Sequence, residues 1–200
     1  MKKSPSCKYI VGIDEVGRGP LAGPVTVCAF AILTKNLKLL DPIHPKDSKM
    51  LSEKKREIIS QSLKQLAAQK KCHYAIASVS SKIIDSKGLT YAITSAVHKA
   101  LETLDMNPKQ AMVYLDGGLR APEIYVHQET VIKGDATVPV ISCASILAKV
   151  FRDRVMKKYD KQFPHYGFGK HKGYGTAEHY RAIYKEGITS IHRLRFLKNV

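Results

Sequence analysis

The spacing of apolar and polar residues predicts an alternation of strands and helices. Short runs rich in β-branched residues predict strands at residues 9–14, 25–33, 73–79, 111–115 and 124–132. Apolar residues at helical spacing predict helices at residues 52–70, 89–104, 140–159 and 176–185, with Ser52 and Thr176 as N-caps. Residues 41–49 contain two prolines and are predicted to form a loop. Because successive strands are mixed with strand–helix units, the pattern favours an α/β domain on a mixed sheet flanked by helices.

Length and composition indicate one globular domain. The 200 residues suffice for one sizeable core but are few for two ordinary domains, and 44% of them are hydrophobic. No apolar run reaches the roughly 18 residues of a membrane-spanning helix, and no secretory leader pattern follows the charged start. We therefore expect a single domain over residues 1–200 that works in the cytoplasm, as a monomer.

The four cysteines do not indicate a disulfide framework or a zinc site. None belongs to a C-x-x-C pair, and none has a histidine at zinc-like spacing. We expect them to be small buried hydrophobic residues.

The charge balance indicates a polyanionic partner. Lys and Arg number 33 against 17 acidic residues, which gives a net charge of +16, and residues 149–200 supply +9 of it. A solvated basic surface is the alternative explanation. Charge alone therefore favours nucleic acid, but it does not separate an enzyme from a binding module.

Four acidic residues follow predicted strands. Asp14 and Glu15 follow the apolar run of the first strand, Asp116 follows the fourth strand, and Asp135 follows the fifth after Lys-Gly. Taken singly, each could be a turn former or a helix cap. Strand ends in α/β sheets are, however, where rigidly held sites are built. These four carboxylates are therefore candidate catalytic residues and metal ligands.

Carboxylates brought together repel one another unless a cation lies between them, and their hard oxygens suit Mg²⁺ or Mn²⁺. Two such ions can activate a water and stabilise the leaving oxygen of a phosphodiester. Adjacent strand residues point to opposite faces, so Asp14 and Glu15 can share a site only if the strand ends or twists there. We expect Asp14 to be the central ligand.

Two glycine-rich segments are candidates for substrate binding. Residues 17–24 hold three glycines and two prolines, a stiff loop whose N–H groups can contact a phosphate or a ribose hydroxyl. Tyr174 lies between two glycines in the most basic part of the chain, where its ring can stack on a sugar or a base. A plain structural turn and a core tyrosine are the alternatives.

These segments resemble the ribonuclease HII family of bacteria. The match covers Gly-Ile-Asp-Glu-Val-Gly-Arg-Gly-Pro-Leu-Ala-Gly-Pro-Val at residues 12–25, followed by Lys-Asp-Ser-Lys at 46–49 and Leu-Asp-Gly at 115–117. It continues with Lys-Gly-Asp at 133–135, the segment 141–154, and Tyr-Gly-Phe and His-Lys-Gly-Tyr at 166–168 and 171–174. Val16 and Cys143 stand where many members have alanine, but neither carries polar chemistry.

The resemblance implies a ribonuclease H-like fold and a metal site of four carboxylates, Asp14, Glu15, Asp116 and Asp135. It implies cleavage of RNA in RNA/DNA hybrids and on the 5′ side of single ribonucleotides in duplex DNA, leaving 5′-phosphate and 3′-hydroxyl ends. It further implies that backbone of Gly17, Arg18 and Gly19 contacts the 2′-hydroxyl and that Tyr174 packs on the following sugar. The basic helical part at about 160–200 is then expected to bind substrate.

Two alternatives stay open. The sister ribonuclease HIII family has an additional N-terminal domain, usually a glutamate as fourth acid and a different glycine loop, whereas only eleven residues precede Gly12 here. A non-catalytic nucleic-acid binder explains the charge but not acids at three strand ends. The first candidates for phosphate contacts are lysines, namely Lys46, Lys49, Lys149 and Lys172. Protein partners are not predicted.

Overall fold

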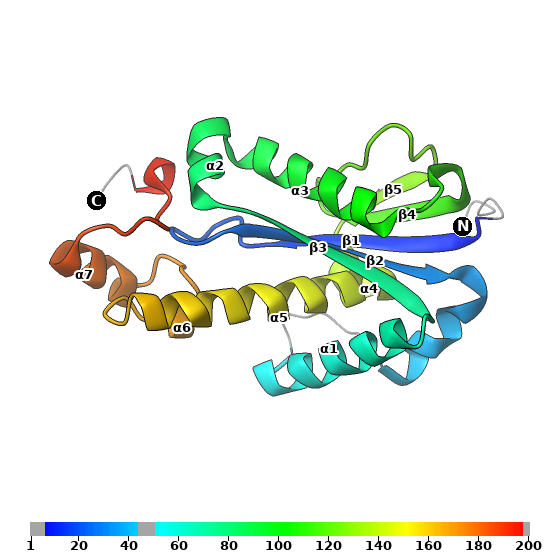
Figure 1. Ribbon diagram of the computed structural model, residues 1–200, viewed down its shortest axis with the longest axis horizontal. Coiled ribbons are helices and arrows are strands. Elements are labelled where there is room, and N and C mark those ends of the chain that lie inside the picture. The colour runs from blue at the N-terminus through cyan, green and yellow to red at the C-terminus, as the bar shows by residue number, and fades with distance from the viewer. Residues whose placement is uncertain (1–6, 44–50, 198–200) are drawn as a thin grey trace.

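Five strands form one mixed sheet in the computed structural model, which describes residues 7–43 and 51–197 (Figure 1). Their order across the sheet is β3-β2-β1-β4-β5. The β1–β2 and β2–β3 pairs are antiparallel, while β1–β4 and β4–β5 are parallel. The strands are β1 (Tyr9–Val16), β2 (Val25–Leu33), β3 (Cys72–Val79), β4 (Ala111–Asp116) and β5 (Gln128–Val131). This confirms the predicted α/β class.

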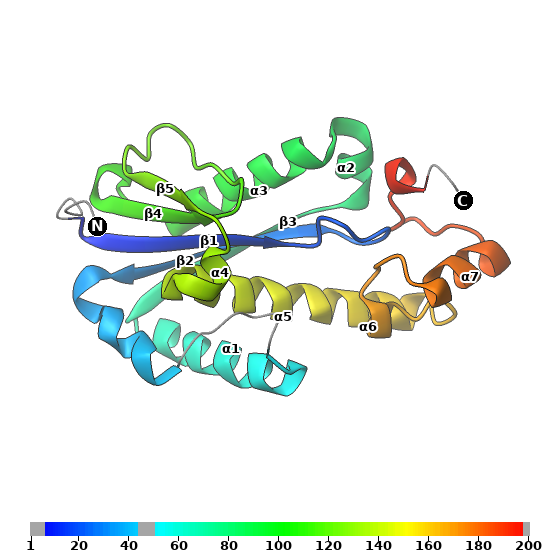
Figure 2. The same cartoon turned by 180° about the vertical axis from the view of Figure 1, so that it is seen from behind.

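Helices cover both faces of the sheet (Figures 1 and 2). On one face lie α2 (Ser81–Lys87) and α3 (Leu89–Leu104), and on the other lie α1 (Glu53–Ala68) and α5 (Pro139–Gln162). Shorter elements complete the chain, namely α4 (Gly134–Thr137), α6 (Phe168–His171), α7 (Ala177–Glu186) and the 3-10 helices η1 (Thr34–Ile43), η2 (Pro108–Gln110) and η3 (Leu194–Phe196).

The alternation of side chains along β2 divides the core into two layers. Val27, Ala29 and Ala31 pack with residues of α3, whereas Phe30 and Ile32 pack with residues of α5 and α1. Because β2 is covered on both faces, its sequence is a continuous apolar run rather than an alternating one. A third cluster joins the end of α5 to α6, α7 and the loop between β1 and β2. It contains Leu21, Met156, Phe168, Ile183 and Ile191.

The structure contains the predicted strands and long helices, but the short elements α4, α6, η2 and η3 were not predicted, and four further places differ. The fifth strand is restricted to Gln128–Val131, and Ile124 and Val126 lie exposed in the preceding loop. The first strand runs on to Val16, so it does not end at Asp14. The short helix α2 escaped prediction because seven residues carry little periodicity. Residues 41–43 end the 3-10 helix η1, whereas 44–49 lie outside the described residues.

The predicted ends of two helices are confirmed. The Ser52 side chain accepts a hydrogen bond from the amide of Lys55, and that of Thr176 accepts one from the amide of His179. Gly187 ends α7 with φ of 79°, a conformation that favours glycine. Cys7, Cys28, Cys72 and Cys143 are free and buried, as predicted. Across residues 7–43 and 51–197, no helix combines the length and the apolar character needed to span a membrane.

Gly12 allows α5 to start directly against the middle of β1. A Cβ atom on Gly12 would overlap the backbone of Val140 and Ile141, at the first turn of the helix. A side chain is therefore excluded at this position unless the helix and the strand move apart.

We expect Gly12→Ala to lower the free energy of unfolding by about 1–3 kcal/mol, the usual cost of overpacking a core. Gly118→Ala is the matched control, because a Cβ there has no heavy atom within 4 Å. Urea denaturation measures both. Equal stability of the two variants would contradict the proposed close contact.

Candidate active site

The sheet register places Asp14 and Asp116 side by side. In the parallel β1–β4 pair, Ile13 is the partner of Leu115, so the next residue on each strand is an aspartate. Glu15 follows on β1, and Asp135 lies in α4, just after the neighbouring strand β5. All four predicted carboxylates thus come from the same end of adjacent parallel strands.

Asp116 also positions the segment that carries Asp135. Its Oδ1 accepts hydrogen bonds from the amides of Gly134 at 2.7 Å and Asp135 at 3.4 Å. The Ser142 hydroxyl donates to the backbone carbonyl oxygen of Asp135. Asp135 is only 2% exposed, so it lies behind the surface of the site.

Three of the carboxylates line one pocket of about 260 Å³. Its wall also contains Ser145 and Lys149 of α5, and further residues of the predicted substrate segments, namely Gly17, Arg18, Gly19 and Tyr174. Asp135 is not part of this wall. The structure therefore brings Asp14, Glu15 and Asp116 together with the glycine loop (residues 17–24) and leaves Asp135 buried beside them.

Asp14 and Glu15 share the pocket although β1 continues through both. The Asp14 carboxylate accepts a hydrogen bond from the Glu15 amide at 2.8 Å, so it turns back along its own backbone. The Glu15 carboxylate forms an ion pair with Arg18 at 2.9 Å. Of the two conditions expected from the sequence, that the strand ends or twists there, the first is not met, because β1 runs on to Val16.

Burial and like charges disfavour ionisation at this site. The pKa of Asp14 is raised to about 7, mainly by burial; a hydrogen bond from Ser145 opposes this rise, and the charges of Glu15 and Asp116 contribute to it. Burial also raises the pKa of Glu15, and the hydrogen bond and charge of Arg18 oppose that rise. A cation bound between these carboxylates would offset the repulsion between their negative charges.

The donor set fits a hard divalent cation. Glu15 Oε2 is buried and has no hydrogen-bond partner among the described residues, so it remains available as a ligand. In the present arrangement, no three His, Cys, Asp or Glu side chains of the described residues are close enough to hold a metal ion. Binding would therefore require the carboxylates to turn toward the ion.

Sequence reasoning overlooked two buried arginines that hold the glycine loop. Arg193 donates to the carbonyl oxygens of Gly17, Arg18 and Gly23, at 2.7 to 2.9 Å. Arg152 donates to those of Pro24, Ala22 and Lys172, at 2.9 to 3.2 Å. Both arginines were counted in the predicted basic region, but neither belongs to its surface.

Tyr174 lies against the glycine loop, because its ring comes within 3.9 Å of the position that a Cβ of Gly19 would occupy. The ring is half-exposed, so one side remains open to a ligand. The backbone directly before Tyr174 is bound to the glycine loop, since the amides of Leu21 and Ala22 both donate to the carbonyl oxygen of Gly173.

Buried histidines hold the backbone of Tyr174. The Thr189 amide donates to His192 Nδ1 at 2.8 Å, so in the neutral ring the proton is on Nε2. The Nε2 of His192 lies 3.1 Å from His179 Nε2, which must therefore accept the hydrogen bond. The proton of the neutral His179 ring is then on Nδ1, which donates to the Tyr174 carbonyl oxygen at 2.9 Å. This order requires both rings to be neutral.

The predicted phosphate-binding lysines have different surroundings. Lys149 is in the pocket wall, with its ammonium group 2.8 Å from the Asp153 carboxylate. Lys172 is buried and donates to the Gly169 carbonyl oxygen, so this position does not support its predicted phosphate contact. Lys46 and Lys49 lie outside the described residues.

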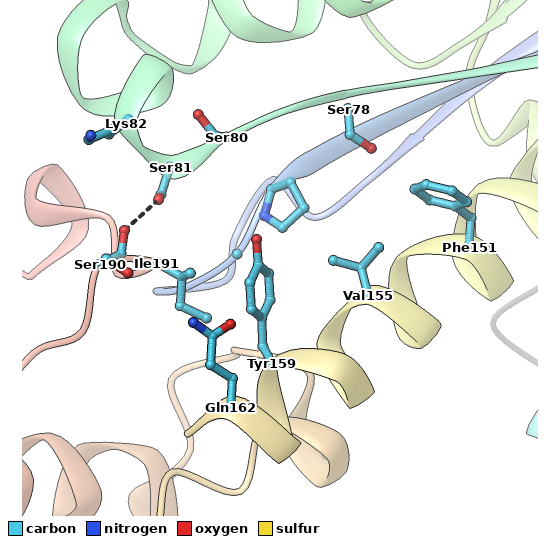
Figure 3. A pocket seen from close by; sticks show the side chains of 12 residues that line it. Ser78, Ser80, Ser81, Lys82, Phe151, Val155, Tyr159, Gln162, Ser190 and Ile191 are labelled. Atoms are coloured by element: carbon cyan, nitrogen blue, oxygen red, sulfur yellow. Dashed lines mark hydrogen bonds between the residues drawn. The ribbon is translucent and has the colours of Figure 1, made fainter. Parts of the chain in front are cut away.

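A larger hollow of about 500 Å³ lies between β3, α5 and the segment before η3 (Figure 3). Serines, Tyr159 and Gln162 line it, and Ser81 donates to the Ser190 carbonyl oxygen at 3.4 Å across one end. Its wall contains no carboxylate. It is therefore separate from the carboxylate site, although Gly23 and Pro24 of the glycine loop border it.

Comparison with known proteins decides the family. The family model described as Ribonuclease HII matches residues 11–199. The chain belongs to the ribonuclease HII family. The ribonuclease HII of Clostridium perfringens (strain SM101 / Type A) is 43% identical over 193 residues, covering 96% of this chain and 68% of the relative. That of Endomicrobium trichonymphae is 45% identical over 187 residues, covering 94% and 84%.

A solved structure agrees with this assignment. The ribonuclease HII in the PCNA complex from Archaeoglobus fulgidus superposes with a TM-score of 0.73 at 26% identity, covering 94% of each chain. The predicted ribonuclease H-like fold is thereby confirmed. As a ribonuclease HII, the chain is a hydrolytic endoribonuclease of the ribonuclease H type, which acts on RNA/DNA hybrids.

We expect acid to destabilise the protein through the histidines behind Tyr174. Burial lowers the pKa of His192 from 6.5 to about 4 and also lowers that of His179. The unfolded chain therefore binds more protons as the pH falls from 6.5 toward 4, and the free energy of unfolding decreases over that window. The His192→Asn variant should have a lower melting temperature than the wild type at pH 7.5, but its melting temperature should decrease less between pH 7.5 and pH 5.5.

Thermal melts at the two pH values measure this difference. The acidic residues of the site contribute equally to the pH dependence of both proteins, so their effect drops out of the comparison. His165→Asn, at an exposed histidine, is the control and should keep the wild-type pH dependence. A His192→Asn variant with the full wild-type decrease in melting temperature would refute the neutral arrangement.

Proposed function

We propose that this ribonuclease HII cuts duplex DNA on the 5′ side of an embedded ribonucleotide, as well as the RNA strand of hybrids, and leaves 5′-phosphate and 3′-hydroxyl ends. One observation carries the proposal. The same pocket is lined by Asp14, Glu15 and Asp116 and by both predicted ribose-reading segments, the glycine loop and Tyr174. A site that reads a ribose therefore lies within reach of a site that holds cations.

The cofactor in this proposal is Mg²⁺ or Mn²⁺, held by Asp14, Glu15, Asp116 and Asp135. Two bound ions supply activation of the attacking water and stabilisation of the leaving oxygen. Asp116 orients the segment of Asp135 through its backbone amides. Arg18 neutralises part of the charge of Glu15, which limits the repulsion within the cluster before a cation arrives.

Recognition of the ribonucleotide is assigned to backbone and ring contacts. Amide groups of the glycine loop contact the 2′-hydroxyl, and the open side of the Tyr174 ring packs on the following sugar. A deoxyribose leaves these polar contacts unmade, which is how such a site separates RNA from DNA. Lys149 lines the pocket wall and is assigned a phosphate contact in this proposal. The basic C-terminal helices, at about 160–200, extend the surface for the duplex.

The direct test is cleavage of a labelled DNA duplex with one ribonucleotide, in Mg²⁺, Mn²⁺ or EDTA, beside an all-DNA duplex. A metal-dependent cut only on the 5′ side of the ribonucleotide supports the proposal. Cleavage of long hybrids alone keeps the family activity but refutes the reading of single ribonucleotides. Tight binding without any cleavage in either metal would favour a non-catalytic binder.

We expect Asp14→Asn to abolish measurable turnover, because the central carboxylate of the proposed cation site is lost. Circular dichroism should show an unchanged fold. Asp105→Asn is the matched control, since Asp105 ends α3 in a left-handed conformation that Asn tolerates. Near-wild-type turnover by Asp14→Asn would contradict the assignment of the metal site.

We also expect Mg²⁺ to raise the melting temperature of the wild-type protein. An ion that binds only the folded chain stabilises it, by roughly 2–4 °C for each kcal/mol in a protein of this size. Asp14→Asn should lose most of this increase, whereas Asp105→Asn should retain it. Differential scanning fluorimetry in EDTA and in Mg²⁺ measures the shift, and equal shifts for all three proteins would argue against cation binding at Asp14.

A further inference from the structure

Arg152 and Arg193 are two fully buried cationic side chains without a carboxylate partner in the described part of the chain. Burying an unpaired charge costs several kcal/mol unless polar groups replace the lost water. Here six backbone carbonyl oxygens replace it, and five of them belong to the glycine loop. So costly an arrangement for one short loop points to a role for its conformation.

Arg193 fixes the orientation of two consecutive peptide planes. Its Nη2 binds the carbonyl oxygen of Gly17 at 2.7 Å, and its Nη1 binds that of Arg18 at 2.9 Å. In a planar trans peptide, the carbonyl of one residue and the N–H of the next point in opposite directions. The amides of Arg18 and Gly19 must therefore point away from the buried guanidinium, on the side of the pocket that these residues line.

Neither of these two amides donates a hydrogen bond to an acceptor within residues 7–43 and 51–197. Adjacent backbone N–H groups with a common direction form a small concave donor site for an oxygen ligand. In this pocket, the donor pair lies next to the carboxylates, where the ribose of a bound substrate would be placed.

Arg152 connects this loop to the backbone of Lys172, two residues before Tyr174. It binds Ala22 and Pro24 on one side and the carbonyl oxygen of Lys172 on the other. Its Nε also occupies the space that a Cβ of Gly17 would need, and Gly17 has φ of 91°. The glycine loop and the tyrosine are thus held by one buried side chain.

We propose that Arg193 and Arg152 are positioning residues for ribose recognition, which fix the glycine loop so that the amides of Arg18 and Gly19 face the 2′-hydroxyl. The inference rests on the proposed function, because it explains how the loop reads a ribose. Lysine cannot replace either arginine, since a single ammonium group lacks the planar fork that binds three carbonyls at fixed angles.

The test is Arg193→Lys, which keeps the charge and removes the fork. Turnover is measured in Mg²⁺ on a duplex with one ribonucleotide, and affinity is measured in EDTA for this duplex and for an all-DNA duplex of the same sequence. We expect turnover to fall roughly 10- to 100-fold, because small misplacements at a reacting centre are that costly. The ratio of the affinity for the ribonucleotide duplex to that for the all-DNA duplex should fall toward one. The affinity for the all-DNA duplex should stay within about twofold of the wild-type value, since phosphate contacts supply it.

Arg154→Lys is the matched control, because this arginine lies on α5 as Arg152 does but is half-exposed and paired with Glu57. It should behave as the wild type. Arg152→Lys is the second positioning variant and should show the same loss of preference as Arg193→Lys. Folded Arg193→Lys and Arg152→Lys proteins with wild-type turnover and preference would overturn the proposal. So would an equal loss of affinity for both duplexes, which indicates a purely structural role.

Amide NMR shifts of the wild-type chain keep the proposal testable if both lysine variants unfold. The Arg18 and Gly19 amides should shift when the ribonucleotide duplex is added and not when the all-DNA duplex is added, and unchanged amides with both would overturn the inference. A wild-type chain that cuts hybrids without preferring the ribonucleotide duplex refutes the proposed ribose reading itself, before any variant is made.

Discussion

The contact between the start of α5 and the middle of β1 is the constraint on which the site depends. Gly12 brings the helix directly onto the strand, and the helix then runs along the site with four residues facing it at spacings of three and four. Each of the four contacts a different part of the site. Ser145 forms a hydrogen bond with Asp14, and Lys149 lines the pocket wall. Arg152 donates to carbonyl oxygens of the glycine loop, and Met156 packs against Gly23 and Gly173. One rigid helix therefore positions both the carboxylates of the proposed cation site and the loop that is proposed to contact the ribose.

Two kinds of support act on the two halves of the site. The carboxylates are held by sheet register, since β1 and β4 are parallel partners up to the residue before each aspartate. The glycine loop has no such ladder, so buried guanidinium groups take its carbonyls instead. The histidines extend this support to Tyr174 through a chain of neutral rings. Burial thus supplies the stiffness that the loop cannot obtain from secondary structure.

Sequence periodicity was sufficient for most of the fold, and the predicted strand ends led to four acidic residues that lie at the same end of adjacent strands. The β2 run was placed to the residue because a strand covered on both faces is apolar throughout. Ile124 and Val126 misled the prediction, since apolar residues in an exposed loop look like a strand when only composition is read. Arg152 and Arg193 were counted as surface charge, because nothing local distinguishes an arginine that binds backbone 170 residues away, as Arg193 binds Gly23. The histidine network was missed for the same reason.

Arg18 takes part in the site twice, through two separate parts of the same residue. Its peptide group is fixed by Arg193, while its side chain forms the ion pair with Glu15. Since every residue except proline carries the same backbone N–H and C=O groups, replacing this side chain would change the charge of the carboxylate cluster without removing the backbone groups that are proposed to contact a sugar. The flanking glycine at 17 has no such freedom, because its backbone conformation and the guanidinium beside it exclude a side chain. Two neighbouring positions of one short loop thus differ in whether they admit a different side chain.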